Sequence, residues 1–161
     1  MIFAQLLKCI INRSNLKLHV RRNLKMASVV YWSQSGNTQA MAEAVAKGAG
    51  VSATYVGDAS VDQLKSEKAF ALGCPAMGAE VLEEGEMEPF VADLEGSVSG
   101  KTIALFGSYG WGDGEWMRDW VERLQNAGAT IVNGEGLICQ DAPDDSVLEE
   151  CEALGKAIAA I

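Results

Sequence analysis

YWSQSGNT, residues 31–38, lies between a short apolar run and a segment with helical periodicity. Hydroxyl and amide side chains crowd this stretch, which contains no lysine or arginine. A helix that begins here presents unpaired backbone N–H groups and the positive end of its dipole beside the hydroxyl donors. The stretch therefore predicts an anion site built from uncharged donors. Plain helix capping by the hydroxyl groups is the alternative interpretation.

Two other kinds of phosphate loop do not match residues 31–38. A Walker loop needs a GK[ST] sequence, whose lysine reaches the outer phosphates of a nucleoside triphosphate, and a dinucleotide-binding loop needs GxGxxG. Neither pattern occurs in this stretch. The sequence accordingly favours a ligand with one terminal phosphate.

The chain from Met26 onward alternates between two kinds of periodicity. Residues 28–32, 69–73 and 102–106 are apolar runs that predict strands buried on both faces, and residues 52–56 and 129–138 are weaker strand candidates. Between them, apolar residues spaced by three or four predict amphipathic helices. These residues are Met41, Ala44, Val45 and Gly48; Met87, Phe90, Val91 and Leu94; Met117, Trp120, Val121 and Leu124; and Val147, Cys151, Leu154 and Ile158. The alternation predicts one α/β domain, residues 26–161, with a parallel sheet covered by helices on both faces.

Charge is distributed unevenly along the chain. The formal net charge is −9, but the first 25 residues contain six of the 13 basic residues and none of the 22 acidic residues. The six are Lys8, Arg13, Lys17, Arg21, Arg22 and Lys25. The rest of the chain is strongly acidic, and such a surface repels nucleic acids and anionic membranes. We therefore expect no nucleic-acid or membrane partner, and we expect partner proteins with basic docking faces.

The basic segment, residues 1–25, is predicted to be an extension outside the domain, either disordered or the product of a mis-assigned start before Met26. An Arg-rich, acid-free composition is also typical of organellar transit peptides, although no small-residue cleavage site follows it. His19, the one histidine of the chain, lies in this segment and is therefore a poor catalytic candidate.

The four cysteines, at positions 9, 74, 139 and 151, are widely spaced and form no CxxC or CxxH pattern. Their spacing suggests neither a zinc site nor a disulfide framework. No apolar stretch reaches the roughly 18–20 residues of a membrane span. We expect a soluble, cytoplasmic protein with reduced cysteines.

Two further loops follow predicted strands, and in sheets of this kind ligands bind at the carboxyl ends of the strands. GCPAMGAE, residues 73–80, is a constrained turn that would present Met77, whose flexible thioether suits contact with an aromatic ring. GSYGWGDG, residues 107–114, is rich in glycine and would display Tyr109 and Trp111 as a stacking surface. A buried methionine and buried aromatic side chains are the alternatives.

YWSQSGNT, GCPAMGAE and LFGSYGWGDGEWM, in this order and at these separations, resemble the flavodoxins, in particular the short-chain type of clostridia and related anaerobes. The resemblance covers residues 26–161. It implies a flavodoxin-like, doubly wound fold with a five-stranded parallel sheet of order 2-1-3-4-5, which holds one non-covalent FMN.

The resemblance also implies a role for each loop. The phosphate loop comprises Ser33, Gln34, Ser35, Gly36, Asn37 and Thr38, joined by Ser108. Met77 would contact the inner face of the flavin, and Trp111 would stack on its outer face. The turn along the flavin edge comprises Gly78, Ala79 and Glu80, and Pro75 and Ala76 before it are also expected to bind the cofactor. The loop around the ring and ribityl chain comprises Tyr109, Gly110 and Gly112. In its flipped, type II form the turn would require a positive φ at Ala79.

The function implied by the resemblance is that of a low-potential single-electron carrier, not an enzyme, which shuttles between semiquinone and hydroquinone. Acidic side chains around the ring would oppose the negative charge of the fully reduced flavin. These side chains are Glu80, Glu83, Glu84, Glu86 and Asp113. We expect a monomer whose partners are oxidoreductases that otherwise use ferredoxin.

A flavin-dependent reductase on the same fold, of the quinone or nitro reductase type, is the alternative function. Such an enzyme needs nicotinamide access over the ring, which Trp111 would cover. A flavin-free phosphate-binding or interaction domain is a third interpretation, and the colour of the purified protein separates it from the other two. The acidic run 83–88 is predicted to be a solvated face, and Trp116 and Trp120 are predicted to be buried.

Overall fold

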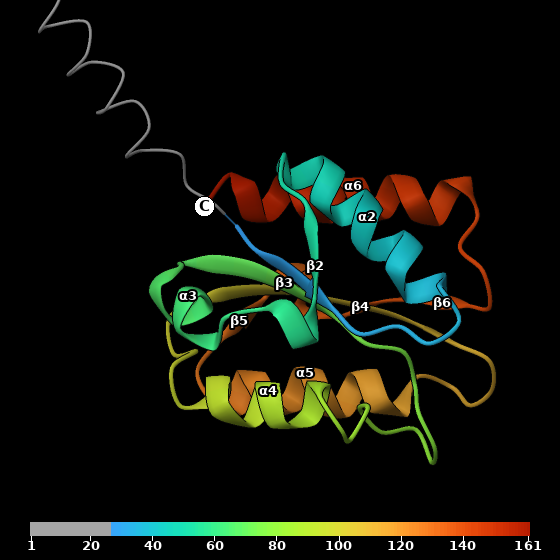
Figure 1. Ribbon diagram of the computed structural model, residues 1–161, viewed down its shortest axis with the longest axis horizontal. Helices are drawn as coiled ribbons and strands as arrows, with labels where there is room; N and C mark the ends of the chain where they lie inside the picture. Colours follow the sequence, from blue (N-terminus) through green and yellow to red (C-terminus); the bar gives the residue numbers. More distant parts are fainter. Residues whose placement is uncertain (1–26) are drawn as a thin grey trace, which may run out of the picture.

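A parallel sheet forms the centre of the computed structural model, which describes residues 27–161 (Figure 1). Its strands are β1 Val29–Tyr31, β2 Ala53–Tyr55, β3 Ala69–Gly73, β4 Thr102–Tyr109, β5 Thr130–Ile131 and β6 Leu137–Gln140. The strand order is β2-β1-β3-β4-β5, with β6 also paired to β4. The predicted α/β class and strand order are confirmed. The predicted extension, residues 1–25, lies outside the described residues.

The fifth position of the sheet is occupied by two short strands instead of the single run predicted at residues 129–138. β5 pairs with the first half of β4 and β6 with its second half, both in parallel. Between them lies a 3₁₀ turn, η2 Val132–Gly134, in which Asn133 has a φ of 60° and Gly134 a φ of 77°. Two successive left-handed residues cannot continue a strand, so the run divides here.

Helices cover both faces of the sheet, as predicted. α2 Asn37–Ala49 and α6 Asp145–Ala159 lie on one face, and α4 Met87–Glu95 and α5 Glu115–Asn126 lie on the other (Figure 1). Each face buries its own apolar cluster against the sheet. Two short elements were not predicted: the 3₁₀ turn η1 Val56–Asp58 and helix α3 Val61–Ser66. Each of these buries a single side chain, which gives no periodic signal.

Glycines allow α2 and α6 to approach each other closely. A Cβ atom on Gly48 would lie 2.0 Å from the carbonyl oxygen of Glu152, and one on Gly155 would lie 1.9 Å from that of Val45. Neither residue can carry a side chain without separation of the two helices. This contact fixes the position of α2, and therefore of its amino terminus at the carboxyl end of the sheet.

None of the helices in the described part of the chain combines the length and apolar character that crossing a bilayer requires. Cys74, Cys139 and Cys151 are free and buried. Burial raises the pKa of the Cys74 and Cys151 thiols to about 12, so neither is a reactive thiolate at neutral pH.

Candidate functional site

Three loops meet at the carboxyl ends of β1, β3 and β4. The Trp32 N–H, after β1, donates to the Gly73 carbonyl at the end of β3, over 2.9 Å. The Ala76 N–H, in the next loop, donates to the Ser108 carbonyl in β4, over 3.0 Å. The structure therefore brings together the three segments that the sequence singled out.

The loop before α2 leaves the amino terminus of that helix open. Gly36 occupies the N-cap position with a φ of 94°, no side chain caps the helix, and its first turn contains no acidic residue. The Ser33 hydroxyl accepts the N–H of Gly36, over 3.1 Å, and not an N–H of the helix. Gln34 and Ser35 are exposed and Asn37 is half-buried. Helix capping by the hydroxyls, the alternative interpretation, is therefore wrong, and the uncapped N–H groups suit an anion.

Two buried hydroxyls join this helix to the sheet. The Thr38 and Ser108 oxygens lie 3.0 Å apart, and the Ser108 N–H donates to the Thr38 hydroxyl over 3.3 Å. Thr38 is 1% exposed and Ser108 is 5% exposed. Because buried polar groups need partners, this pair fixes the first turn of α2 against the end of β4. Thr38 thus positions the loop predicted to hold the phosphate.

The turn after β3 closes as a three-residue loop. Met77 and Val81 exchange two backbone hydrogen bonds, each of 2.9 Å. The positive φ values fall at Gly78, 50°, and Glu80, 53°. Ala79 does not have a positive φ, so the turn in this structure is not the flipped, type II form, and the requirement for a positive φ at Ala79 in that form stays a prediction. The reason is that Met77 pairs with Val81, which places the left-handed residue next to the closing pair.

The glycine-rich loop after β4 separates its two aromatic side chains. Trp111 is 66% exposed, between the exposed Gly110 and Gly112. Tyr109 is half-buried, and its ring centroid lies 5.6 Å from that of Trp116. The prediction of a displayed aromatic surface therefore holds for Trp111, whereas Tyr109 packs partly into the core. Trp116 and Trp120 are buried, as predicted.

The comparisons with known proteins agree with this geometry. The flavodoxin family model matches residues 29–155. A flavodoxin from Clostridium beijerinckii is 49% identical over 138 residues, which cover 83% of this chain and 99% of that protein. The chain belongs to the flavodoxin family. A flavodoxin from Megasphaera elsdenii is 45% identical over 139 residues, which cover 83% of this chain and 98% of that protein.

The likeness extends to three dimensions. The solution structure of two-electron reduced M. elsdenii flavodoxin has a TM-score of 0.74 to this chain at 45% identity, and the match covers 84% of this chain and 100% of that one. Flavodoxins are electron carriers that bind FMN and are not enzymes. The predicted family, cofactor and carrier function are confirmed, and the reductase alternative is not favoured.

The residues present fit FMN. The open amino terminus of α2, surrounded by neutral donors, suits a phosphate, and the exposed indole of Trp111 suits an apolar ring. Met77 is half-buried, and in the sequence it lies between the α2 loop and the Trp111 loop. Its neighbour Ala76 is hydrogen-bonded to Ser108 of β4, so the Met77 turn lies beside that strand. The assignment of individual residues to parts of FMN stays a prediction.

The acidic run 83–88 of this flavodoxin is more structured than predicted. Glu83 accepts the N–H groups of Gly85, Glu86 and Met87. Burial raises its pKa, but these bonds outweigh burial and lower the pKa below its usual range. No standard capping signal identifies this role in the sequence, because Glu83 lies four positions before Met87, the first residue of α4, and caps are normally Ser, Thr, Asp or Asn directly before the helix.

A second carboxylate of the run binds two aromatic side chains, which sequence reasoning missed. Glu86 accepts the Trp32 indole N–H over 3.1 Å and the Tyr55 hydroxyl. The bond to Glu86 is the main cause that raises the pKa of Tyr55 to about 12. No local signal indicates this cluster, because its members come from three separate segments.

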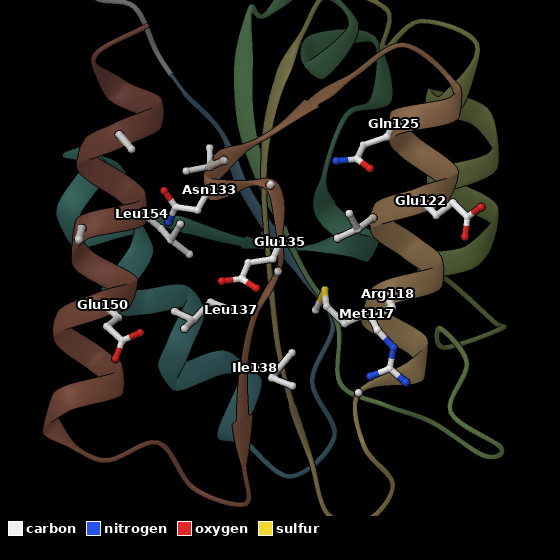
Figure 2. A pocket seen from close by; sticks show the side chains of 17 residues that line it. Met117, Arg118, Glu122, Gln125, Asn133, Glu135, Leu137, Ile138, Glu150 and Leu154 are labelled. Carbon is white, nitrogen blue, oxygen red and sulfur yellow. The ribbon is translucent and has the colours of Figure 1, made fainter.

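A hollow of about 830 Å³ lies elsewhere on this flavodoxin, between α5 and α6 (Figure 2). Met117 and Glu122 of α5 line one side, Leu154 of α6 lines the other, and Leu137 and Ile138 of β6 lie between them. None of the predicted FMN residues borders it. The candidate FMN site is instead formed by surface loops, one of which displays Trp111.

Proposed function

We propose that the chain is a low-potential single-electron carrier in which non-covalent FMN binds across the three loops. The single observation that carries the proposal is the exposure of Trp111, at 66%, on a loop that follows β4 directly. A large indole that a glycine-rich loop exposes to water is stabilised when an aromatic ring covers it. FMN supplies one- and two-electron redox chemistry when bound.

The loop at residues 33–38 is proposed to hold the phosphate with neutral donors. The N–H groups at the start of α2 would direct the positive end of the helix dipole toward the anion, and the hydroxyls of Ser33 and Ser35 would donate to it. Ser108, hydrogen-bonded to Thr38, completes this end of the site. Because no lysine or arginine belongs to the loop, no cationic side chain of the loop would neutralise the phosphate.

Met77 and Trp111 are proposed to contact opposite faces of the ring, and the acidic surroundings set its potential. Glu80 and Asp113 lie in the two loops that would contact the ring. Asp113 forms an ion pair with Arg118 of α5, over 2.7 Å, whereas Glu80 has no ion pair within residues 27–161. Negative charges nearby oppose the addition of further negative charge. A low reduction potential follows from this arrangement.

The partners are proposed to be oxidoreductases with basic docking faces, of the kind that otherwise use ferredoxin. Val81, 42% exposed, lies beside Glu80 and close to Glu83 and Glu84. An apolar side chain surrounded by carboxylates suits a partner surface with basic residues around an apolar contact. We infer a monomer in the cytoplasm, where the free cysteines would stay reduced. Electron-transfer rates that do not fall with added salt would contradict the charge-based docking.

The experiment that tests the site is FMN titration of the apoprotein, followed by quenching of flavin fluorescence. We expect Trp111→Ala to weaken FMN binding about 30-fold, from the lost apolar burial. Ser35→Ala should weaken it about tenfold, because one bond to a charged phosphate is lost. Ser52→Ala is the control, because Ser52 is exposed in another part of the chain. Equal affinities in all variants would refute the assignment.

A further inference from the structure

We propose that the Glu80 carboxylate is a positioning group that joins the Met77 turn to the amino terminus of α5 and so sets the spacing of the two loops that enclose the FMN ring. The inference rests on the proposed function. One oxygen, Oε1, accepts the N–H of Gly114 over 2.9 Å and the N–H of Glu115 over 3.0 Å. Glu80 precedes these residues by 34 and 35 positions, so the bond links two separate loops.

Helix α5 depends on this carboxylate for its cap. Its N-cap residue is Gly114, with a φ of 93°, and no side chain at that position caps the helix. A helix amino terminus leaves N–H groups that need an acceptor, and its dipole favours a negative charge. Glu80 supplies both from the loop that follows β3. Ionised acceptors form stronger hydrogen bonds than neutral ones, so the two bonds from Gly114 and Glu115 to Glu80 hold the loops together strongly.

The glycine beside Trp111 makes room for the same carboxylate. A Cβ atom on Gly112 would lie 2.3 Å from Cδ of Glu80 and 2.6 Å from both of its carboxylate oxygens. The carboxylate therefore packs directly on the backbone of the Trp111 loop. Glu80 contacts this loop at Gly112 and binds its end at Gly114, which restricts the loop on the side next to the Met77 turn.

The backbone of Glu80 is held in an unusual conformation by the closing pair of its turn and by the contact with α5. Its φ of 53° is unusual for a residue other than glycine and carries a steric penalty, whereas Gly78 in the same turn adopts a positive φ, 50°, without this penalty. Strain at one residue persists where surrounding bonds determine it. The two bonds to α5 and the Met77–Val81 pair supply that constraint.

A loop that is ordered before binding loses less entropy when its ligand arrives. With the bridge in place, Trp111 starts from a restricted loop, so FMN binding does not have to order it. Loss of the bridge should leave FMN bound less tightly, mainly because it dissociates faster. The oxygen Oε2 of Glu80 accepts no hydrogen bond from residues 27–161, so one oxygen suffices for the bridge.

The test compares Glu80→Ala, Glu80→Gln and the control Glu84→Ala in the full-length chain. Glu84 is exposed in the same acidic segment and makes no side-chain hydrogen bond to residues 27–161. Without FMN, amide hydrogen exchange at Gly114 and Glu115 should be about tenfold faster in Glu80→Ala than in the parent chain. Glu80→Gln, which keeps an oxygen acceptor, should restore most of the protection, and Glu84→Ala should behave like the parent.

FMN dissociation, followed by the recovery of flavin fluorescence, is the second measurement. We expect it to be about tenfold faster in Glu80→Ala and close to the parent rate in Glu84→Ala. Unchanged amide exchange in Glu80→Ala, or equal acceleration in Glu84→Ala, would overturn the bridge. Faster exchange with an unchanged dissociation rate would overturn its role in FMN binding. Failure of the parent chain to bind FMN would refute the proposed function instead, and the exchange data would still report on the bridge.

Discussion

Gly155→Ala tests the contact that holds α2, and with it the phosphate loop, against the rest of the molecule. The added Cβ would lie 1.9 Å from the Val45 carbonyl oxygen, whereas ordinary contacts begin at 3.4 Å. The two backbones must therefore separate by about 1.5 Å, the difference between these distances. Neither helix can yield by rotating a side chain, because the colliding atom belongs to the main chain of α2.

The expected loss of stability is the difference between two effects. Alanine is favoured over glycine in a helix by about 1 kcal/mol, which opposes the damage. Overpacking costs about 1–3 kcal/mol, and we expect the upper end here because backbone is displaced. The net destabilisation is about 2 kcal/mol, which for a domain of this size lowers the melting temperature by roughly 6–8 °C. Because α2 moves, FMN affinity should fall as well.

Urea unfolding of the apoprotein, with Gly96→Ala as the control, measures this effect. Gly96 ends α4 with ordinary right-handed angles, and a Cβ there would meet no atom within 4 Å. The control should therefore be as stable as the parent chain or slightly more stable. If Gly155→Ala unfolds at the same urea concentration as Gly96→Ala, helix propensity outweighs the clash, and the close helix contact is not a constraint on the fold.

Three further outcomes follow from the hydrogen bonds around the site. Thr38→Val leaves the Ser108 N–H and hydroxyl without a partner and should cost about 1–3 kcal/mol in urea unfolding, so parent-like stability would contradict the buried pair. Because the pKa of Glu83 is lowered in the folded state, its stabilisation is complete above pH 4.5 and is lost as pH falls through the lowered pKa. The stability gap between the parent and Glu83→Gln should thus shrink on acidification, and a gap that is constant with pH would argue against this. In ultraviolet titration, Glu86→Gln should lower the pKa of Tyr55 from about 12 toward 10.0, and no change would remove Glu86 as its cause.

The sequence predicts best the elements whose signal is continuous. β3 has the predicted bounds, 69–73, because every residue of it is apolar and buried on both faces. The division of the fifth strand was missed although Asn133 and Gly134 form a dipeptide that favours turns. Helix α3 was missed because it buries only Leu64. Length and local pattern decide what a single sequence reveals about secondary structure.

In the candidate site, too, features set by neighbouring residues can be predicted from the sequence, and contacts between distant residues cannot. The open loop before α2 follows from residues within eight positions, and the sequence indicates it. The links that place the loops relative to one another join residues far apart: Thr38 with Ser108 across 70 positions, and Glu80 with Gly114 across 34. No periodicity or motif reports such pairs, because they exist only once the sheet has brought the strand ends together.

The Thr38–Ser108 and Glu80–Gly114 hydrogen bonds both join a loop of the proposed FMN site to β4 or to the segment that follows it. The Thr38–Ser108 pair ties the phosphate loop to the end of β4, and Glu80 ties the Met77 turn to the segment that follows β4. β4 is paired on one side with β3 and on the other with β5 and β6, so it is an interior strand and a rigid reference for the loops. The two ends of the proposed site are therefore aligned by one buried strand, and the exposed Trp111 loop departs from that strand directly. Loops that would each be mobile alone are thus restricted through hydrogen bonds to a rigid element, which is what a carrier needs to keep its cofactor in one orientation between partners.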